Sequence, residues 1–361
     1  MSPGETFLDF ITTERLYGAA IVFGSTTAII VLMIYTYLYQ KKQRFFKRQK
    51  IADILDEWIG EALLDEEGGH IYVTPDLRKE LELPVNRQFA VNQLISTRKN
   101  LTGGAAMNIS RLYEQLDLKK DSLDKFHDKR WYKKARGIYE LYMMNEVDMK
   151  DKIAVHTNSE NENIRTEAQT ALITFSGFDG LDFLDTLTYP LTDWQQLKIL
   201  EQLKALNPQD MPGLLRWIRS ENEYVVLFAL RLAEIYYQLQ VHDDVVHCLD
   251  HTNDRIRLQA IITLARLANL STTGILVQHY PIETPANKRA ILQQLFKISG
   301  DEELPFLQLE LDNPDDLLKL ESARAIARNC SNGFEVLAAR AELQPVPYLH
   351  IYNHVKYELK R

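Results

Sequence analysis

The sequence predicts an all-α protein in which an N-terminal transmembrane helix is followed by a right-handed α-solenoid. Two observations support this fold class: an uncharged stretch near the N-terminus, and an apolar pattern that recurs about every 31 residues. A period between 20 and 50 residues is typical of stacked repeats, in which no unit buries its apolar face alone. The recurring positions, each 30 or 31 residues after the last, are Ile164, Trp194, Val225, Ile256, Asn287 and Leu318.

Mostly small or apolar residues follow these positions at offsets of four and eight. Both offsets lie on one face of a helix, so this face is expected to pack against a second helix. The residues at +4 are Ala168, Lys198, Ala229, Ala260, Ile291 and Ser322, and those at +8 are Leu172, Gln202, Ala233, Leu264, Leu295 and Ile326.

The uncharged stretch covers residues 17–39, which hold no charged side chain over 23 positions. As a helix it is about 34 Å long, enough to cross a hydrocarbon core of roughly 30 Å. Tyrosines stand at its ends, where amphipathic rings favour the membrane interface. The sequence therefore predicts an uncleaved single span, preceded by a short extracytoplasmic N-terminus over residues 1–16.

A basic patch follows the span. Cytoplasmic flanks of membrane helices carry an excess of Lys and Arg, so the long C-terminal part is expected in the cytoplasm and the short N-terminus outside. The patch also predicts contact with anionic lipid headgroups. Its members are Lys41, Lys42, Arg44, Lys47, Arg48 and Lys50.

Within the span, Ala20, Gly24 and Ala28 repeat at intervals of four. Small residues at this spacing let two membrane helices approach closely. They predict a packing face for a partner helix or for a second copy of this chain, although small residues are also common on spans that face lipid.

Charge and cysteine usage exclude several classes. The formal net charge is −8, and because residues 1–40 carry −2 and residues 41–50 carry +6, the rest of the chain carries −12. Nucleic-acid binding depends on clustered cations, so no nucleic-acid partner is expected. Cys248 and Cys330 lie far apart without a CxxC motif, which argues against a disulfide framework or a zinc site.

Five segments are expected from this pattern: the N-terminus, the span, a basic juxtamembrane and amphipathic stalk helix over residues 40–66, an N-terminal helical segment over 67–127, and a repeat solenoid with a C-terminal cap over 128–361. The stalk has apolar residues at helical spacing from Ile51 onward. In the solenoid, each repeat is expected to hold a short first helix and a longer second helix. Residues 242–269 illustrate the plan, with Asn253 or Asp254 capping the second helix.

The second helices resemble HEAT repeats, whose pattern is V/I-R-x-x-A followed by an apolar turn. The resemblance rests on Ile164, Arg165 and Ala168, on Ile256, Arg257 and Ala260, and more weakly on Val225, Ala229 and Leu318. The repeat length is similar to that of the short HEAT-like repeats of the phycobilisome-lyase type. The resemblance implies HEAT-like helical hairpins in an armadillo-like superhelix. Lys288 and Lys319 stand in for the repeat arginine, whereas Gln195 and Val226 depart from it.

The anchor, the stalk and the segment up to Met144 also resemble membrane-anchored HEAT-repeat proteins of bacteria. The stretches RKNLTGGAAMNISRLYEQLDL and DKRWYKKARGIYELY carry this likeness. It implies a bacterial inner-membrane setting and no particular activity.

No catalytic or cofactor motif stands in the sequence. His247 and His251 are four residues apart, as zinc ligands on a helix can be, but no third ligand is identifiable and ordinary helix-end histidines are the favoured interpretation. Most Trp and Tyr residues from position 131 onward have helical spacing and are expected in the core. Any that prove exposed would be candidate anchors for a partner.

We therefore expect a non-enzymatic single-span membrane protein whose cytoplasmic repeats bind protein partners. It would act as a scaffold or regulatory subunit, for example of an envelope or glycosyltransferase complex. No cofactor or metal is expected. Two alternatives stay open at this point: a lyase-like enzyme using the solenoid groove, and a membrane signalling protein.

Overall fold

The computed structural model describes residues 13–64, 72–204, 206, 211 and 213–359, and within these ranges every regular element is a helix. The chain forms two compact units, Met1–Glu146 and Val147–Arg361. The expected boundary at residue 128 therefore lies upstream of the observed one. The helix that was assigned to the first repeat belongs to unit 1, because it packs against the helix before it in an α-hairpin.

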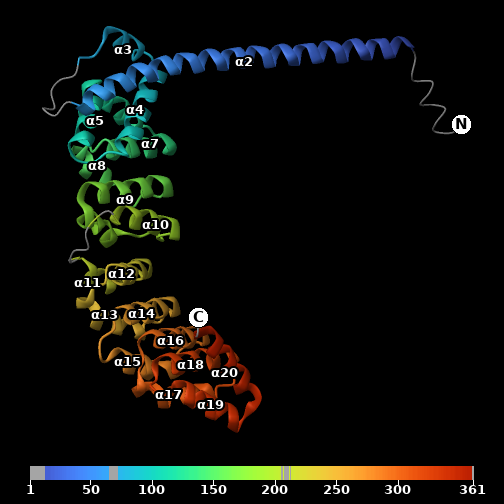
Figure 1. Ribbon diagram of the computed structural model, residues 1–361. Coiled ribbons are helices and arrows are strands. Elements are labelled where there is room, and N and C mark those ends of the chain that lie inside the picture. The colour runs from blue at the N-terminus through green and yellow to red at the C-terminus, as the bar shows by residue number, and fades with distance from the viewer. Residues whose placement is uncertain (1–12, 65–71, 205, 207–210, 212, 360–361) are drawn as a thin grey trace. The chain divides into compact units, whose positions relative to one another are not determined.

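Unit 1 begins with one long helix that contains both the predicted span and the predicted stalk (blue in Figure 1). Its C-terminal part packs against the next helices of the unit, and its core centres on Leu55, Leu94, Ile109 and Tyr113. The helices of unit 1 are α2 (Thr13–Leu64), α3 (Pro75–Glu80), α4 (Pro84–Arg98), α5 (Gly103–Gln115), α6 (Lys119–His127) and α7 (Trp131–Met143).

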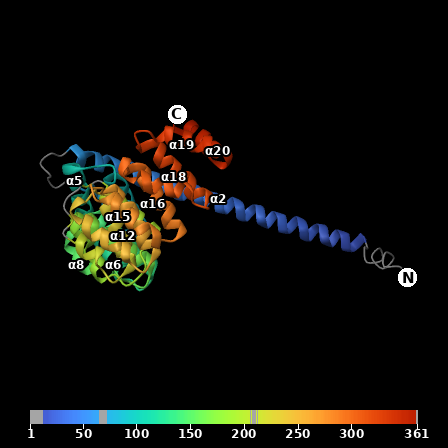
Figure 2. The same cartoon turned by 90° about the horizontal axis from the view of Figure 1, so that it is seen from below.

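Unit 2 is a solenoid of short first helices and longer second helices that succeed one another in chain order (green to red in Figure 1). Seen from below, α16, α18, α19 and α20 lie to one side of α12 and α15 (Figure 2). The second helices are α9 (Glu162–Ser176), α10 (Asp193–Leu203), α12 (Glu223–Ile235), α14 (Asp254–Arg266), α16 (Pro285–Ile298) and α18 (Asp316–Asn329).

The first helices are short because turns and 3-10 segments interrupt them. They are α8 (Lys150–Ala154), the 3-10 helix η2 (Gly177–Thr186), α11 (Leu214–Ile218), α13 (His242–His247), α15 (Thr272–His279), α17 (Leu304–Leu311) and α19 (Gly333–Leu343). Shorter 3-10 turns accompany several of them: η1 (Val147–Met149), η3 (Leu239–Val241), η4 (Cys248–Asp250), η5 (Tyr280–Ile282) and η6 (Asp301–Glu303). The last helix is α20 (Pro345–Leu359).

Each second helix starts at a polar cap, which satisfies backbone N–H groups that lack a partner within the helix. The cap of α14 is Asn253, whose side chain accepts a hydrogen bond from the Arg255 N–H at 2.9 Å. The caps repeat with the period of the helices and are Asn161, Thr192, Asn222, Asn253, Thr284 and Asp315.

The caps correct the sequence register at one repeat. In every second helix except α10, the predicted repeat position is the third helical residue and is buried; in α10 that residue is Gln195, not Trp194. The assignment of Trp194 is therefore wrong by one residue. With the corrected register, Ile199 and Leu203 occupy the +4 and +8 positions, and both are buried.

The polar Gln195 is tolerated at a buried position because both the oxygen and the nitrogen of its amide are hydrogen-bonded. Its side-chain oxygen accepts from the Thr192 N–H at 3.0 Å, which completes a capping box. Its side-chain nitrogen donates to the Thr166 hydroxyl of α9 at 3.0 Å.

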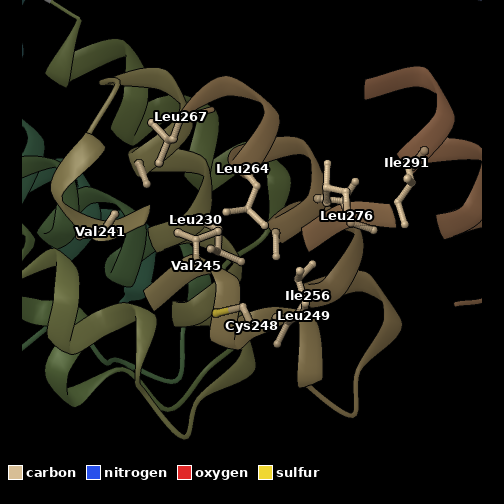
Figure 3. Packing of buried hydrophobic residues seen from close by; sticks show 14 of the residues in the cluster. Leu230, Val241, Val245, Cys248, Leu249, Ile256, Leu264, Leu267, Leu276 and Ile291 are labelled. Atoms are coloured by element: carbon tan, nitrogen blue, oxygen red, sulfur yellow. The ribbon is translucent and has the colours of Figure 1, made fainter. Parts of the chain in front are cut away.

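The core of unit 2 runs through consecutive hairpins without a break. Figure 3 shows side chains from α12 to α16 meeting in this core, including Leu230, Val245, Ile256 and Ile291. The repeat-defining residues Ile164, Ala168, Val225, Ala229, Ala260 and Leu318 are all buried, as the sequence predicts.

Candidate protein-interaction surface

The repeat arginines hold the hairpins together. Arg165 donates to the Ser159 carbonyl at 2.6 Å, and Arg257 donates to the His251 carbonyl at 2.9 Å, each six residues earlier. In α10 the corresponding residue, Gln196, donates to the Leu191 carbonyl at 3.0 Å, five residues earlier. These side chains therefore close the turn between the two helices of a repeat, and their role is structural.

The same arginines also reach the following repeat. The guanidinium of Arg165 lies 4.6 Å from the ring centre of Tyr189. The Nε of Arg257 lies 3.0 Å from the buried carboxylate of Glu283, which also accepts from Asn287 at 2.8 Å. Further polar contacts join residues about 30 positions apart, so each repeat is linked mainly to its neighbour: Glu167 with Lys198, His242 with Thr272, Tyr280 with Glu310, and Asp301 with Ser331.

Two neighbouring second helices expose apolar side chains although the core beneath them is filled. On α10 the exposed face is formed by Trp194, Leu197, Glu201 and Lys204, at helical spacing. Trp194 is 68% exposed, because the register of α10 places Gln195 in the core instead. The corresponding face of α12 is formed by the exposed Tyr224 and Ile235 and by the half-buried Leu227 and Arg231.

Arg231 joins these two faces, since it donates to the Gln196 side chain at 2.6 Å and lies 3.4 Å from Asp193. A cavity of about 500 Å³ lies toward the C-terminal ends of the two helices. Its lining is apolar except for one lysine and the tyrosine hydroxyls, and consists of Leu200, Lys204, Leu206, Ile235, Tyr236 and Tyr237. We call the two faces and this cavity the α10–α12 surface.

The following second helices carry cations at the position of Ile235. Arg266, Lys297 and Arg328 stand in the last turns of α14, α16 and α18, are spaced 31 residues apart, and are exposed. A cation near a helix C-terminus is favoured by the helix dipole. Arg266 also lies 5.5 Å from the ring centre of Tyr237, which connects the first of these cations to the α10–α12 surface.

Several aromatic residues that the sequence places in the core are exposed instead. Trp131, Tyr132, Tyr224 and Tyr237 join Trp194 in this group, whereas Trp217 is buried and donates to the Asp185 carboxylate at 2.8 Å. Helical spacing identifies the face of a residue only if the register is known, and aromatic side chains fit both kinds of face.

The N-terminal helix α2 has a stretch, Tyr17–Lys42, that is long and apolar enough to cross a membrane. The hydroxyls of Ser25, Thr26, Thr27 and Thr36 each donate to a carbonyl four residues earlier, at 2.7–2.9 Å. These bonds satisfy the polar groups of the stretch within the helix, as an apolar environment requires.

The other predicted site residues on α2 lie along its exposed part. Ala20, Gly24 and Ala28 are exposed and no side chain of the described residues covers them. Lys41 and Lys42 are also exposed. The side chains of Arg44, Lys47, Arg48 and Lys50 lie outside the described residues, as does the N-terminus up to residue 12.

The histidine pair takes part in ordinary helix-end contacts: His251 accepts from the Asn253 N–H at 3.0 Å, and His247 is exposed. Among the described residues, no group of three His, Cys, Asp or Glu side chains is placed to hold a metal. The nearby thiol of Cys248 is buried, and burial raises its pKa to about 11.

Together these features define an all-α solenoid protein with an N-terminal helix able to span a membrane. No family model matches the chain, and no curated protein matches it. The chain is similar to human deoxyhypusine hydroxylase in complex with glycerol, with 16% identity and a TM-score of 0.30 over 79% of this chain and 97% of that chain.

Two engineered proteins are also similar. One has 13% identity and a TM-score of 0.38 over 85% of this chain and 99% of its own length. The other has 12% identity and a TM-score of 0.23 over 72% of this chain and 100% of its own length. At these identities and TM-scores the likenesses carry no argument about the activity of this chain.

Proposed function

We propose that this chain is a non-enzymatic, single-span protein of the bacterial inner membrane whose cytoplasmic solenoid binds a protein partner. It would act as a scaffold or regulatory subunit of a membrane complex, with the N-terminus outside. The observation that carries the proposal is the α10–α12 surface, where Trp194, Leu197 and Tyr224 stand exposed above a filled core. Exposed aromatic anchors beside an apolar cavity are typical of energetically dominant contacts in protein interfaces.

The membrane setting rests on α2 and on the excess of cations at its C-terminal flank. Lys and Arg accumulate on the cytoplasmic side of membrane helices, and six of them follow the span. Attachment to a membrane raises the effective concentration of a partner in the same membrane.

The cations next to the α10–α12 surface narrow the chemistry of the partner. Neighbouring helices pack with axes about 8–10 Å apart, and an extended chain advances about 3.3 Å per residue. A partner segment could place an apolar residue in the cavity. Acidic residues at about every third position after it would then lie opposite Arg266, Lys297 and Arg328 in turn.

Affinity capture from native membranes, after crosslinking, tests this proposal. The double substitution Trp194→Ala, Leu197→Ala is expected to weaken recovery of the partner at least about tenfold, since interface anchors contribute about 2 kcal/mol or more each. The control is Leu309→Ala, which removes an exposed leucine from the first helix α17. Equal recovery with all three proteins would refute the assignment of this surface.

A charge test addresses the acidic segment. Arg266→Glu with Lys297→Glu is expected to abolish binding. Lys150→Glu with Lys152→Glu makes the same change in net charge at α8 and is the control, which is expected to keep binding. If both pairs weaken binding to the same extent, the cation row has no specific role.

A further inference from the structure

The hairpin of α6 and α7 carries a concentration of positive charge that contrasts with the rest of the chain. Residues 119–136 hold eight Lys and Arg residues and three Asp residues, whereas the chain after position 50 carries −12 in total. Asp121 is paired with Arg87 and Asp128 with Arg130, at 2.5 and 2.8 Å. Among the cations, Lys119 pairs with Glu146, Lys125 and Arg136 pair with Glu140, and Lys133 also lies 3.3 Å from Asp128. Lys120 and Lys129 are exposed.

Two aromatic side chains stand among these cations at the tip of the hairpin. Trp131 is 49% exposed and Tyr132 is 51% exposed, with their rings in an edge-to-face contact at 5.9 Å. The guanidinium of Arg130 lies 6.0 Å from the ring centre of Tyr132. We call residues 129–133 the hairpin tip.

The tether keeps unit 1, which includes this tip, close to a membrane. The candidate span ends at Lys42, and the core of unit 1 begins at Ile51, which is 1% exposed. Nine residues of helix advance about 14 Å, and α7, with 13 residues, is about 20 Å long. Unit 1 as a whole therefore lies within a few tens of ångströms of the bilayer surface, and ordinary helix tilts of about 20° vary that distance.

We propose that the hairpin tip rests on the anionic phospholipid headgroups of the membrane that α2 spans. Trp and Tyr favour the headgroup region, and Lys and Arg are attracted by anionic lipids. The abundance of lysine argues against a protein partner, because lysine is depleted in protein interfaces. The contact is a second attachment point, which fixes the orientation of unit 1 on the membrane. It rests on the membrane-spanning part of the proposed function.

The full-length chain in lipid vesicles provides the test. His127→Cys introduces an exposed thiol beside the tip for a maleimide fluorophore, while the native Cys248 and Cys330 are buried. Vesicles contain a phosphatidylcholine with a nitroxide on its headgroup, either without or with about one-third phosphatidylglycerol. Quenching is expected to be at least about twofold greater with phosphatidylglycerol, and to fall at 1 M salt, where screening acts within about 3 Å.

Matched charge variants decide whether the tip is responsible. Lys129→Glu with Arg130→Glu, both exposed residues of the tip, is expected to remove the effect of phosphatidylglycerol, and Trp131→Ser to reduce it. Lys79→Glu with Arg111→Glu makes the same change in net charge at other exposed sites of unit 1 and is expected to retain the effect. Equal loss with both pairs would overturn the proposal.

Carbonate extraction separates the possible failures. Quenching that does not depend on phosphatidylglycerol, in vesicles from which carbonate fails to extract the chain, would overturn the contact and leave the anchor intact. Extraction by carbonate would overturn both. A salt-sensitive gel shift of single-stranded RNA that Lys129→Glu with Arg130→Glu abolishes, together with lipid-independent quenching, would assign the tip to nucleic acid instead.

Discussion

Units 1 and 2 both bury an ionised carboxylate, but they surround it differently. In unit 1, Glu140 of α7 has a fully buried side chain and accepts from Gln88 of α4, from Ser122 and Lys125 of α6, and from Arg136 of its own helix, at 2.6–2.8 Å. In unit 2, Glu321 of α18 accepts from Arg289 and Gln293 of α16 and from Arg324 of its own helix, at 2.9–3.2 Å.

The surroundings of Glu140 and Glu321 reflect two ways of linking helices in an all-α unit. Glu140 joins α4, α6 and α7 at one point, so these three helices of unit 1 share one polar centre. Glu321 joins only neighbouring second helices, as expected of a solenoid whose stability is a sum of nearest-neighbour terms. Loss of one such link in unit 2 should therefore affect two neighbouring second helices, whereas loss of the Glu140 centre should affect α4, α6 and α7 together.

The largest expected effect comes from Glu140→Gln. The substitution leaves the ammonium of Lys125 beside a neutral amide in a buried site, and breaking a buried pair costs about 3–5 kcal/mol. Hydrogen exchange measured by mass spectrometry should show faster exchange throughout α4, α6 and α7, with unit 2 unchanged. Faster hydrogen exchange confined to α7 would contradict the view that Glu140 holds α4, α6 and α7 together.

Gly137→Ala ranks next. An added Cβ would lie 2.4 Å from the backbone nitrogen of Phe126, where α6 and α7 cross. The backbone cannot yield as a side chain can, so we expect a loss of about 3 kcal/mol in the free energy of unfolding of unit 1. Gly60→Ala in α2 meets no atom within 4 Å and should instead stabilise the helix by up to about 1 kcal/mol. Both are measurable by chemical denaturation of the full chain in detergent.

Glu321→Gln should cost less, about 2 kcal/mol, because the link has fewer partners and one of them, Arg289, is half-exposed. Faster hydrogen exchange is expected in α16 and α18 only. If it spread evenly from α9 to α20, unit 2 would behave as one cooperative block, and the contrast with unit 1 would fail.

Acidification should affect both centres in the same direction. Burial opposes ionisation of Glu140, but the contacts with Lys125, Ser122 and Gln88 outweigh it and hold the pKa of Glu140 below its ordinary value of 4.5. Burial likewise opposes ionisation of Glu321, and the contacts with Gln293, Arg324 and Arg289 hold its pKa below the ordinary value. A lowered pKa in the folded state contributes stability that is present above the ordinary value and is lost as the pH falls through the folded value. Thermal unfolding of unit 1 between pH 7 and pH 3 should therefore depend less steeply on pH in Glu140→Gln than in the unsubstituted chain.

The smallest effect on stability is expected for Trp194→Ala. Because this side chain is mostly exposed, its removal should change the free energy of unfolding by less than about 0.5 kcal/mol. Trp217→Ala, in the same unit but buried, should cost about 3–5 kcal/mol. Comparable losses from the two substitutions would mean that Trp194 belongs to the core.

The repeats were predictable because their core residues recur at a fixed period and are mostly apolar. The one register error arose at Gln195, a polar residue that is buried because it caps its helix and bonds to Thr166. Apolar matching alone preferred the neighbouring Trp194. The spacing of the caps, with Thr192 and Asn222 only 30 residues apart, contains the signal that would have found the correct register.

The polar centre of unit 1 was not predictable, because Glu140 and Gln88 are 52 positions apart and no repeat relates them. The α10–α12 surface was only partly predictable. The sequence makes its aromatic residues candidate anchors on the condition that they are exposed. Their exposure depends on the register of α10 and on the filled core beneath them.

The most direct test of the central claim, that the α10–α12 surface binds a protein partner, is site-specific photocrosslinking. A photoreactive phenylalanine analogue is placed at Trp194, or at Leu309 on α17 as the comparison, in full-length chain made in its native cells. We predict one protein adduct of defined mass from position 194 and none from position 309. The same adducts from both positions, or none from position 194, would contradict the account.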